Sequence, residues 1–397
     1  MTPRSESQAV GAVSPAWEVL LYNWLASFVL LLSFYLLTAQ LPVYVQSLGI
    51  SHGAIGIIIG CLTLISMLLK PFAGWGTDRF GRRPLMLAGA LIFVVSSLGY
   101  GWSRTVGALV IVRLLHGCGM GLYPTAASAV VADVSPSRRL AELIGLYSTS
   151  GALAMAAGPL IGVAVVRRYG FPLLFVSSAA LAVLAILLIV PIEETLKQRI
   201  STPFRFSSTL CQQAAFPSLI IFFVMLTFGA QFAFVPIYAN ERRMNPGLFF
   251  LVLAVVIAFA RLLGGRFSDR LGRRRPTLVG LVIVAIALTE LALGGDGRDL
   301  MIAAGLFGIG FGIVDPALRA WCLDGIVPQN RGRAMGTYLL AYDLGFGVGA
   351  VVAGFAVDRV GFTATFLGGA AVALSAGILV LMRREIEFRP GCASGVA

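Results

Sequence analysis

The sequence predicts an all-α membrane protein with twelve transmembrane helices, arranged as two halves of six. Of its 397 residues, 58% are hydrophobic and only 12% are charged, whereas soluble domains carry about 25% charged residues. The apolar runs are about 20 residues long, which is the length that a hydrocarbon core of about 30 Å requires. A stretch between two of these runs, Gly74–Arg83, is also repeated at Gly265–Arg274.

The repeat extends well beyond this stretch. Asp78 and Asp269 are 191 residues apart, close to half the chain. The same separation relates Asp133 to Asp324, Gly145 to Gly336 and Gly170 to Gly361. Because one offset is kept at so many positions, we expect two homologous halves. Six spans in each half give both the same orientation, which is a parallel repeat about an axis along the membrane normal.

Hydropathy predicts where the spans lie, with ends good to a few residues. In the first half they are 17–46, 53–76, 84–102, 105–132, 140–166 and 170–191. In the second half they are 216–240, 246–267, 276–294, 299–323, 332–356 and 361–382. The predicted division is a tail over 1–16, a bundle over 17–191, a linker over 192–214, a bundle over 215–385 and a tail over 386–397.

The positive charge predicts topology rather than a nucleic-acid partner. Most of the 30 Lys and Arg residues fall in short loops and tails on the side of the termini. Because basic loops stay on the cytoplasmic side, we expect a multi-pass protein of the cell's inner (cytoplasmic) membrane with both termini cytoplasmic. The stretch 1–16 is polar and does not resemble a cleavable signal peptide.

Composition also excludes several cofactors. Two histidines, His52 and His116, are too few for a multi-histidine metal site, and the five cysteines contain no close pair. The phosphate-binding pattern Gly-x4-Gly-Lys-[Ser/Thr] does not occur. We therefore expect no metal and no cofactor.

The repeated stretch has a physical logic. Glycine lets two helices approach closely, an aspartate can accept hydrogen bonds at a neighbouring helix start, and arginines stay at the anionic leaflet. The alternative is a merely basic loop. The predicted gating residues are Gly74, Asp78, Arg79, Gly81, Arg82 and Arg83, with Gly265, Asp269, Arg270, Gly272, Arg273 and Arg274 in the second copy.

This stretch resembles the signature between spans 2 and 3 of the major facilitator superfamily, with its usual echo between spans 8 and 9. The resemblance covers about residues 17–385. It implies two six-helix bundles around a central cavity, working by alternating access. It also implies that Asp78 clasps the start of span 11 in the outward-facing state, so that Asp78 and Asp269 act as gates and not as substrate ligands.

A second motif, Arg113 to Gly119, resembles the family's span-4 pattern Arg-x3-Gly-x-Gly, which is associated with proton-coupled members. An arginine within hydrocarbon costs at least about 2.5–3.5 kcal/mol unless it has a partner. Arg113 therefore needs a cavity or a counter-charge, or it forms a structural salt bridge. His116 stands where glutamine is common, either as a proton carrier or as a hydrogen-bonding helix contact.

A third motif in span 5 is similar to the pattern of antiporters. It comprises Gly145, Gly158, Pro159 and Gly162, and it departs from the pattern at Ala154 and Val163. The small residues and the proline kink suit close packing of spans 5 and 8. The second half lacks the proline, and this one-sidedness favours efflux over uptake. Small-residue faces are also common in any helical bundle.

Three acids lie within predicted spans: Asp343, Asp315 and Glu290. A carboxyl group in such a place can gain and lose a proton as the transporter works. We expect Asp343 to carry the proton, with Asp315 second and Arg113 and Arg319 tuning the site. Asp315 and Arg319 are four residues apart and could instead form a fixed pair. Glu290 ranks lower because the resemblance makes span 9 peripheral.

The predicted substrate cavity takes residues from spans 1 and 7. Gln40 and Gln231 share the 191-residue offset, and Tyr35 and Phe232 add an amphipathic, aromatic character.

Together these features predict a secondary transporter that exports a drug, sugar or other metabolite by proton antiport. Its expected partners are a small-molecule substrate, protons and the lipid bilayer, and we expect a monomer. The first alternative is a proton symporter for uptake of an organic acid or sugar. A membrane-embedded enzyme is disfavoured because isolated histidines offer no nucleophile and base, whereas a lipid flippase or a transport-inactive sensor stays open.

Overall fold

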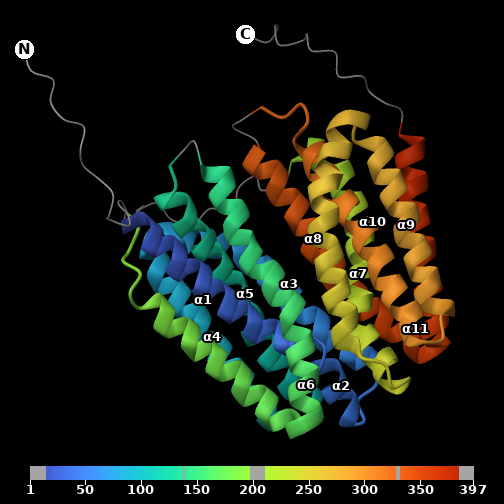
Figure 1. The fold of residues 1–397 in the computed structure, drawn as a ribbon, viewed down its shortest axis with the longest axis horizontal. Helices are drawn as coiled ribbons and strands as arrows, with labels where there is room; N and C mark the ends of the chain where they lie inside the picture. The colour runs from blue at the N-terminus through green and yellow to red at the C-terminus, as the bar shows by residue number, and fades with distance from the viewer. Residues whose placement is uncertain (1–14, 137–138, 197–210, 328–330, 384–397) are drawn as a thin grey trace, which may run out of the picture.

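The computed structural model describes residues 15–136, 139–196, 211–327 and 331–383, and within them only the backbone of 15–16, 140–141, 262–270 and 332. The described chain forms helices joined by short connections (Figure 1). The helices of the first half are Pro15–Thr38 (α1), Leu41–Ser47 (α2), His52–Phe80 (α3), Arg82–Trp102 (α4), Val106–Val134 (α5) and Leu140–Ile189 (α6). Those of the second half are Gln212–Ala214 (η1), Ala215–Glu241 (α7), Pro246–Leu271 (α8), Arg274–Leu293 (α9), Gly297–Leu323 (α10) and Arg331–Met382 (α11).

These helices correspond to the twelve predicted spans. Nine helical stretches of the described chain are long and apolar enough to cross a membrane, and Pro246–Arg261 in α8 is a shorter apolar one. Two of the nine, in α6 and α11, contain a non-helical glycine, Gly170 (φ 81°) and Gly361 (φ 77°). At both points the chain turns back on itself, as Figure 1 shows for α6. Each of these two helices therefore supplies two spans, which brings the total to twelve.

The two halves repeat the same contacts. Arg82 Nε donates to Asp133 Oδ2 at 3.0 Å, and Arg273 Nε donates to Asp324 Oδ2 at 3.0 Å, 191 residues later. The next arginines, Arg83 and Arg274, both bond a carbonyl oxygen at the end of the half, that of Val190 and that of Leu381. The repeat predicted from the sequence is thus a repeat of individual hydrogen bonds.

Small residues repeat in the same way within α5 and α10. A Cβ at Gly119 would lie 3.1 Å from the carbonyl oxygen of Gly89, and one at Gly310 would lie 2.7 Å from that of Gly280. Only glycine allows backbones to approach this closely. α5 therefore packs on α4 as α10 packs on α9.

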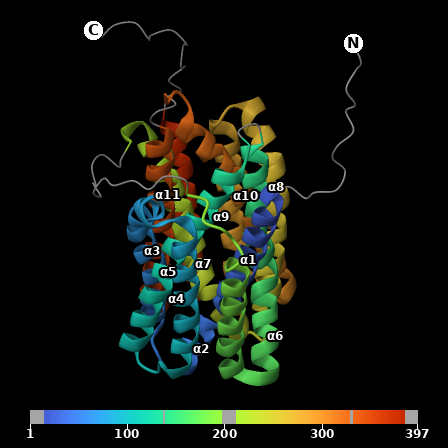
Figure 2. The same ribbon diagram turned by 90° about the vertical axis from the view of Figure 1, so that its left-hand side faces the viewer.

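The halves contact each other on one side of the molecule. We call the end with the turns at Gly170 and Gly361 the Gly170 side, and the opposite end the Gly81 side. On the Gly170 side α3 lies along α11, where a Cβ at Gly56 would overlap the carbonyl oxygen of Ala350. Figure 1 shows the N-terminal half, coloured blue to green, beside the C-terminal half, coloured yellow to red, and Figure 2 shows the molecule from the side of the N-terminal half.

Polar contacts close the same side. Asp358 of α11 accepts hydrogen bonds from the backbone N–H groups of His52 (3.1 Å) and Gly53 (2.7 Å), and it contacts His52 Nδ1 at 2.9 Å. A carboxylate at a helix N-terminus is favoured by the helix dipole. Gln46 Nε2 also donates to Glu241 Oε1 at 2.7 Å. Both contacts join one half to the other.

Towards the Gly81 side the halves separate. Glycines on three of the helices have open space beside them: no described atom lies within 4 Å of a Cβ built on Gly74 (α3), Gly145 (α6) or Gly336 (α11). The same α3 and α11 backbones are in contact near the opposite end, at Gly56 and Gly60. The two halves therefore form a wedge that is closed on the Gly170 side.

The contact at Gly56 gives a first prediction. Gly56→Ala should lower the thermal unfolding midpoint of the purified protein, because overpacking at such a site costs about 1–3 kcal/mol. Gly305→Ala in α10 is the control, since its Cβ meets no described atom within 4 Å and removing a helical glycine gains about 1 kcal/mol. Equal midpoints for the two variants would contradict the α3–α11 contact.

Candidate functional site

A cavity of about 440 Å³ lies between the two halves. Its wall comes from α1, α2, α3, α5 and α6 of the first half and from α7, α8, α10 and α11 of the second. Among the described residues, α4, α9 and the final segments of α6 and α11 contribute nothing to it. These are spans 3, 9, 6 and 12, so the wall is built by the central spans alone.

Much of the wall is aromatic. Phe228 and Phe311 stack with ring centroids 5.1 Å apart, and Phe232 lies 5.4 Å from Phe346. Tyr35 and Phe232, two of the predicted cavity residues, both line it. Such rings favour an apolar or aromatic ligand that can stack against them.

The two predicted glutamines do not line the cavity. Gln40 is buried in the break between α1 and α2, and Gln231 is buried on α7. Gln231 Nε2 has no hydrogen-bond partner among the described residues. The two residues share the 191-residue offset, but neither is among the residues that line the cavity.

Asp343 on α11 lines the cavity and forms an ion pair with Lys70 on α3. The pair joins the two halves, and it lies where the α3–α11 contact gives way to open space. The side chain of Asp343 is 12% exposed and that of Lys70 is 39% exposed. Lys70 is absent from the residues predicted from the sequence, although a lone lysine in an apolar run requires a counter-charge.

Asp315 is held in a different way. Its Oδ1 accepts from Arg319 Nε (2.8 Å) and from the Tyr338 hydroxyl (3.0 Å), and its Oδ2 accepts from Arg261 Nη2 (3.2 Å). The side chain is 4% exposed, and all four residues belong to the second half. Because both of its oxygens are bonded, the geometry favours the alternative in which Asp315 and Arg319 form a fixed pair, with Arg261 as a further partner.

Arg113 and His116 of α5 have separate surroundings. Arg113 lines the cavity and donates to the carbonyl oxygens of Ile58 (3.1 Å) and Ile59 (3.4 Å). No acidic side chain of the described chain pairs with it. His116 is fully buried outside the cavity, with Nδ1 3.0 Å from the Tyr100 hydroxyl. That geometry favours a helix contact over proton carriage for His116.

The span-5 motif packs mainly on α1. A Cβ at Gly158 would lie 2.6 Å from Cβ of Tyr35, and one at Gly162 would overlap the carbonyl oxygen of Leu36. Packing against span 8 is made by Pro159 of the motif and by its neighbour Leu160, whose backbones lie beside Gly247 of α8. No described atom lies within 4 Å of a Cβ built on Gly145.

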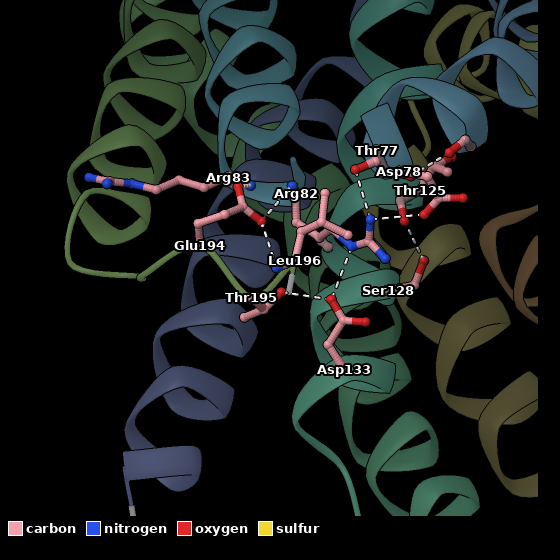
Figure 3. Close-up of polar contacts among 12 residues, drawn as sticks. Thr77, Asp78, Arg82, Arg83, Thr125, Ser128, Asp133, Glu194, Thr195 and Leu196 are labelled. Carbon is pink, nitrogen blue, oxygen red and sulfur yellow. Dashed lines mark hydrogen bonds and ion pairs between the residues drawn. The ribbon is translucent and has the colours of Figure 1, made fainter. Parts of the chain in front are cut away.

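Most of the predicted Gly74–Arg83 loop is helical, because α3 continues to Phe80 and only Gly81 (φ 113°) separates it from α4. Arg82 Nη1 donates to Asp78 Oδ1 at 2.9 Å and to the Thr77 carbonyl oxygen at 2.7 Å (Figure 3). Among the described residues, the bonded partner of Asp78 is thus Arg82 of its own half.

Glu194, which follows α6, caps the start of α4. Its carboxylate accepts from the backbone N–H groups of Arg82 (2.9 Å) and Arg83 (3.2 Å), as Figure 3 shows. Arg79 lies over the Trp75 ring, 5.5 Å from its centroid. Charges from the first half therefore fix the Gly81 turn in the described chain.

The second copy is only partly described. Only the backbone is described at Gly265, Asp269 and Arg270, so the side chains of Asp269 and Arg270 lie outside the described residues. Gly272 has φ 76°, as the equivalent turn requires, and Arg273 and Arg274 make the bonds given above. Glu290 is half-buried on α9 and does not line the cavity.

The two acids should differ in their effect on stability. Asp315→Asn leaves two guanidinium groups without their counter-charge, and breaking a buried pair in this way costs about 3–5 kcal/mol. Asp343→Asn frees only a half-exposed lysine, at a cost of about 1 kcal/mol. Thermal unfolding in detergent should therefore show a clearly larger loss for Asp315→Asn. An equal loss, or a larger one for Asp343→Asn, would contradict the distinction between the two acids.

In the described chain, twelve apolar spans in two similar halves, with an amphipathic cavity between them, define a multi-pass membrane transporter. A sequence model described as the Major Facilitator Superfamily matches residues 24–326 and 246–392. The chain belongs to this superfamily of transporters, and it is not an enzyme.

Known relatives resemble it over nearly their whole length. It is 28% identical to the multidrug resistance protein MdtG of Proteus mirabilis, covering 90% of this chain and 94% of that protein. It is 23% identical to the quinolone resistance protein NorA of Staphylococcus aureus, again with 90% and 94% covered. The crystal structure of the nucleoside transporter NupG superposes with a TM-score of 0.77 at 15% identity, covering 91% of this chain and 98% of that one. That structure supports the fold, which the sequence predicts correctly.

Proposed function

We propose that this protein exports a small molecule in exchange for protons by alternating access. The observation that carries the proposal is the Lys70–Asp343 ion pair. Among the described residues, Asp343 is the acid on the cavity wall, and its partner comes from the other half of the molecule. A titratable group at this place can couple the binding of a ligand in the cavity to the ion pair that holds the two halves together.

The exchange follows from competition at one carboxylate. When Asp343 is ionised, a basic or hydrogen-bond-donating group of the substrate can take the place of Lys70 and bind there. A proton from the other side of the membrane neutralises Asp343 and removes that attraction, so the substrate leaves. Because substrate and proton exclude each other at Asp343, each weakens the binding of the other, as linkage requires.

The described state fits one end of this cycle. With both termini cytoplasmic, as the basic loops predict, the Gly81 side faces the cytoplasm and the cavity is open inward. Asp358 of α11, which accepts hydrogen bonds from the first residues of α3, would then hold the external side closed. Asp78 pairs with Arg82 of its own half, which fits a state other than the outward-facing one.

The direction of transport rests on two supports. Relatives named for multidrug and quinolone resistance share about a quarter of their residues with this chain. The Gly158–Pro159 kink occurs in the first half only, as in the antiporter pattern. Both supports favour export of a drug or metabolite over uptake.

A second candidate function is uptake of an organic acid together with a proton. The excess of cations around the cavity favours it. If a proton on Asp343 frees Lys70 to bind a substrate anion, proton and substrate bind together, which is symport. The two functions move protons in opposite directions relative to the substrate.

Proteoliposomes with an acidic interior and an internal pH dye test the proposal. A substrate added outside should make the interior more alkaline with the wild-type protein, because protons leave as the substrate enters. In Asp343→Asn the rate of alkalinisation should be at least about tenfold lower, because the variant lacks the carboxyl group that exchanges the proton. Glu290→Gln is the matched control and should behave as the wild type, because Glu290 lies off the cavity.

Further acidification on substrate addition would support the symport alternative and contradict antiport. Wild-type exchange by Asp343→Asn would show that another group carries the proton.

A further inference from the structure

We propose that the transported molecule carries an anionic group, such as a carboxylate or sulfonate, on an aromatic body, and that Arg113 and Arg261 bind this group. The inference rests on the proposed function only in taking the central cavity as the transport site. It adds the substrate's chemical class, and it assigns roles to Arg113 and Arg261 beyond tuning the proton site.

Charge balance is the first argument. Lys70, Arg113 and Arg261 line the cavity, against a single acid, Asp343. Directly behind the wall, Arg261 shares the carboxylate of Asp315 with Arg319. Four cations thus face two carboxylates in the described part of the site. Even with both acids ionised, two positive charges have no counter-charge.

Pairing locates the two unmatched charges. Asp343 is taken by Lys70, and one carboxylate, Asp315, serves both Arg261 and Arg319. Arg113 has no acidic partner among the described residues, and it donates to neutral carbonyl oxygens on α3. Because Arg319 lies closest to Asp315 (2.8 Å, against 3.2 Å for Arg261), the excess charge falls on Arg113 and Arg261. Both of these line the cavity.

Low dielectric surroundings make this excess significant. Charge inside a helical membrane protein is unfavourable without a partner, and walls of one sign raise the local concentration of the opposite ion. Guanidinium groups match carboxylate and sulfonate oxygens in geometry as well as charge. An anion that enters the cavity can therefore pair with the guanidinium groups that lack a counter-charge of their own, whereas a simple lipophilic cation is repelled by them.

The aromatic body is inferred from what surrounds Arg261. Its guanidinium carbon lies 5.7 Å from the Phe311 ring centroid, and Phe311 stacks on Phe228. A side-chain exposure of 46% leaves Arg261 open to a ligand. An acid bound there would place its attached ring beside the two phenylalanines, where stacking is favourable. A donor group elsewhere on the molecule could still reach Asp343.

Binding to the purified protein, without any gradient, tests this inference. The probes are dansylglycine, an aromatic carboxylate, and dansylglycinamide, its neutral isostere, both followed by dansyl fluorescence. The acid should bind at least about tenfold more tightly than the amide, which corresponds to about 1.4 kcal/mol. Arg113→Gln and Arg261→Gln should each weaken acid binding several-fold and leave amide binding within about twofold.

Three controls keep the test informative. Arg298→Gln changes an exposed cation at the start of α10 and should leave both affinities unchanged. Arg261→Lys keeps the charge and should retain part of the preference for the acid, which a merely structural role would not predict. Retained amide binding shows that a variant is folded.

Equal affinity for acid and amide, or a preference that survives both glutamine variants, would overturn the inference. Since no proton gradient is involved, failure of antiport in proteoliposomes leaves this result intact, and the reverse also holds.

Discussion

The ion pair between Lys70 and Asp343 is the interaction on which the site depends. Charge inside a membrane protein is unfavourable without a partner, so each carboxylate in the centre pairs with cations beside it. Asp315 is surrounded by two arginines and a tyrosine of its own half, and it stabilises that half. Asp343 instead finds its partner across the cavity. Two acids of one type thereby acquire different roles, one structural and one available for exchange.

A second feature governs the contact between the halves. At each end of the molecule, the N-terminus of a helix in one half can be capped by an aspartate of the other half. Asp358 caps α3 from the opposite half on the Gly170 side. The family resemblance gives Asp78 the same task at the start of α11, on the Gly81 side. In the described state the first cap is made and Asp78 is bonded to Arg82. A carboxylate can thus cap a helix N-terminus at either end of the molecule. Each cap would hold one end closed by the same kind of interaction, and a transporter that alternates between two states requires such a pair.

Sequence patterns predict the repeat and the spans, because these depend on hydropathy and on one offset, although they do not predict the bonds that Arg82 and Arg273 form. They do not predict Lys70 or the role of Arg261, since those pairs join helices far apart in the chain. One signal was available in the sequence. Because Asp315 already has Arg319 four residues away, the lone Lys70 was the remaining candidate for an ion pair with Asp343. Gln40, Gln231 and His116 were assigned to the site, yet they lie off the cavity. A single residue of helix phase rotates a side chain by about 100°, and hydropathy does not fix that phase.

The central claim is that Asp343, rather than Asp315, gains and loses the proton. Infrared difference spectroscopy over a pH titration measures this directly, because a protonated carboxyl has a carbonyl band that a carboxylate lacks. The account predicts a band that appears on acidification, disappears in Asp343→Asn and persists in Asp315→Asn. A band that persists in Asp343→Asn and disappears in Asp315→Asn would contradict it and would make the Arg261–Asp315–Arg319 network the proton site.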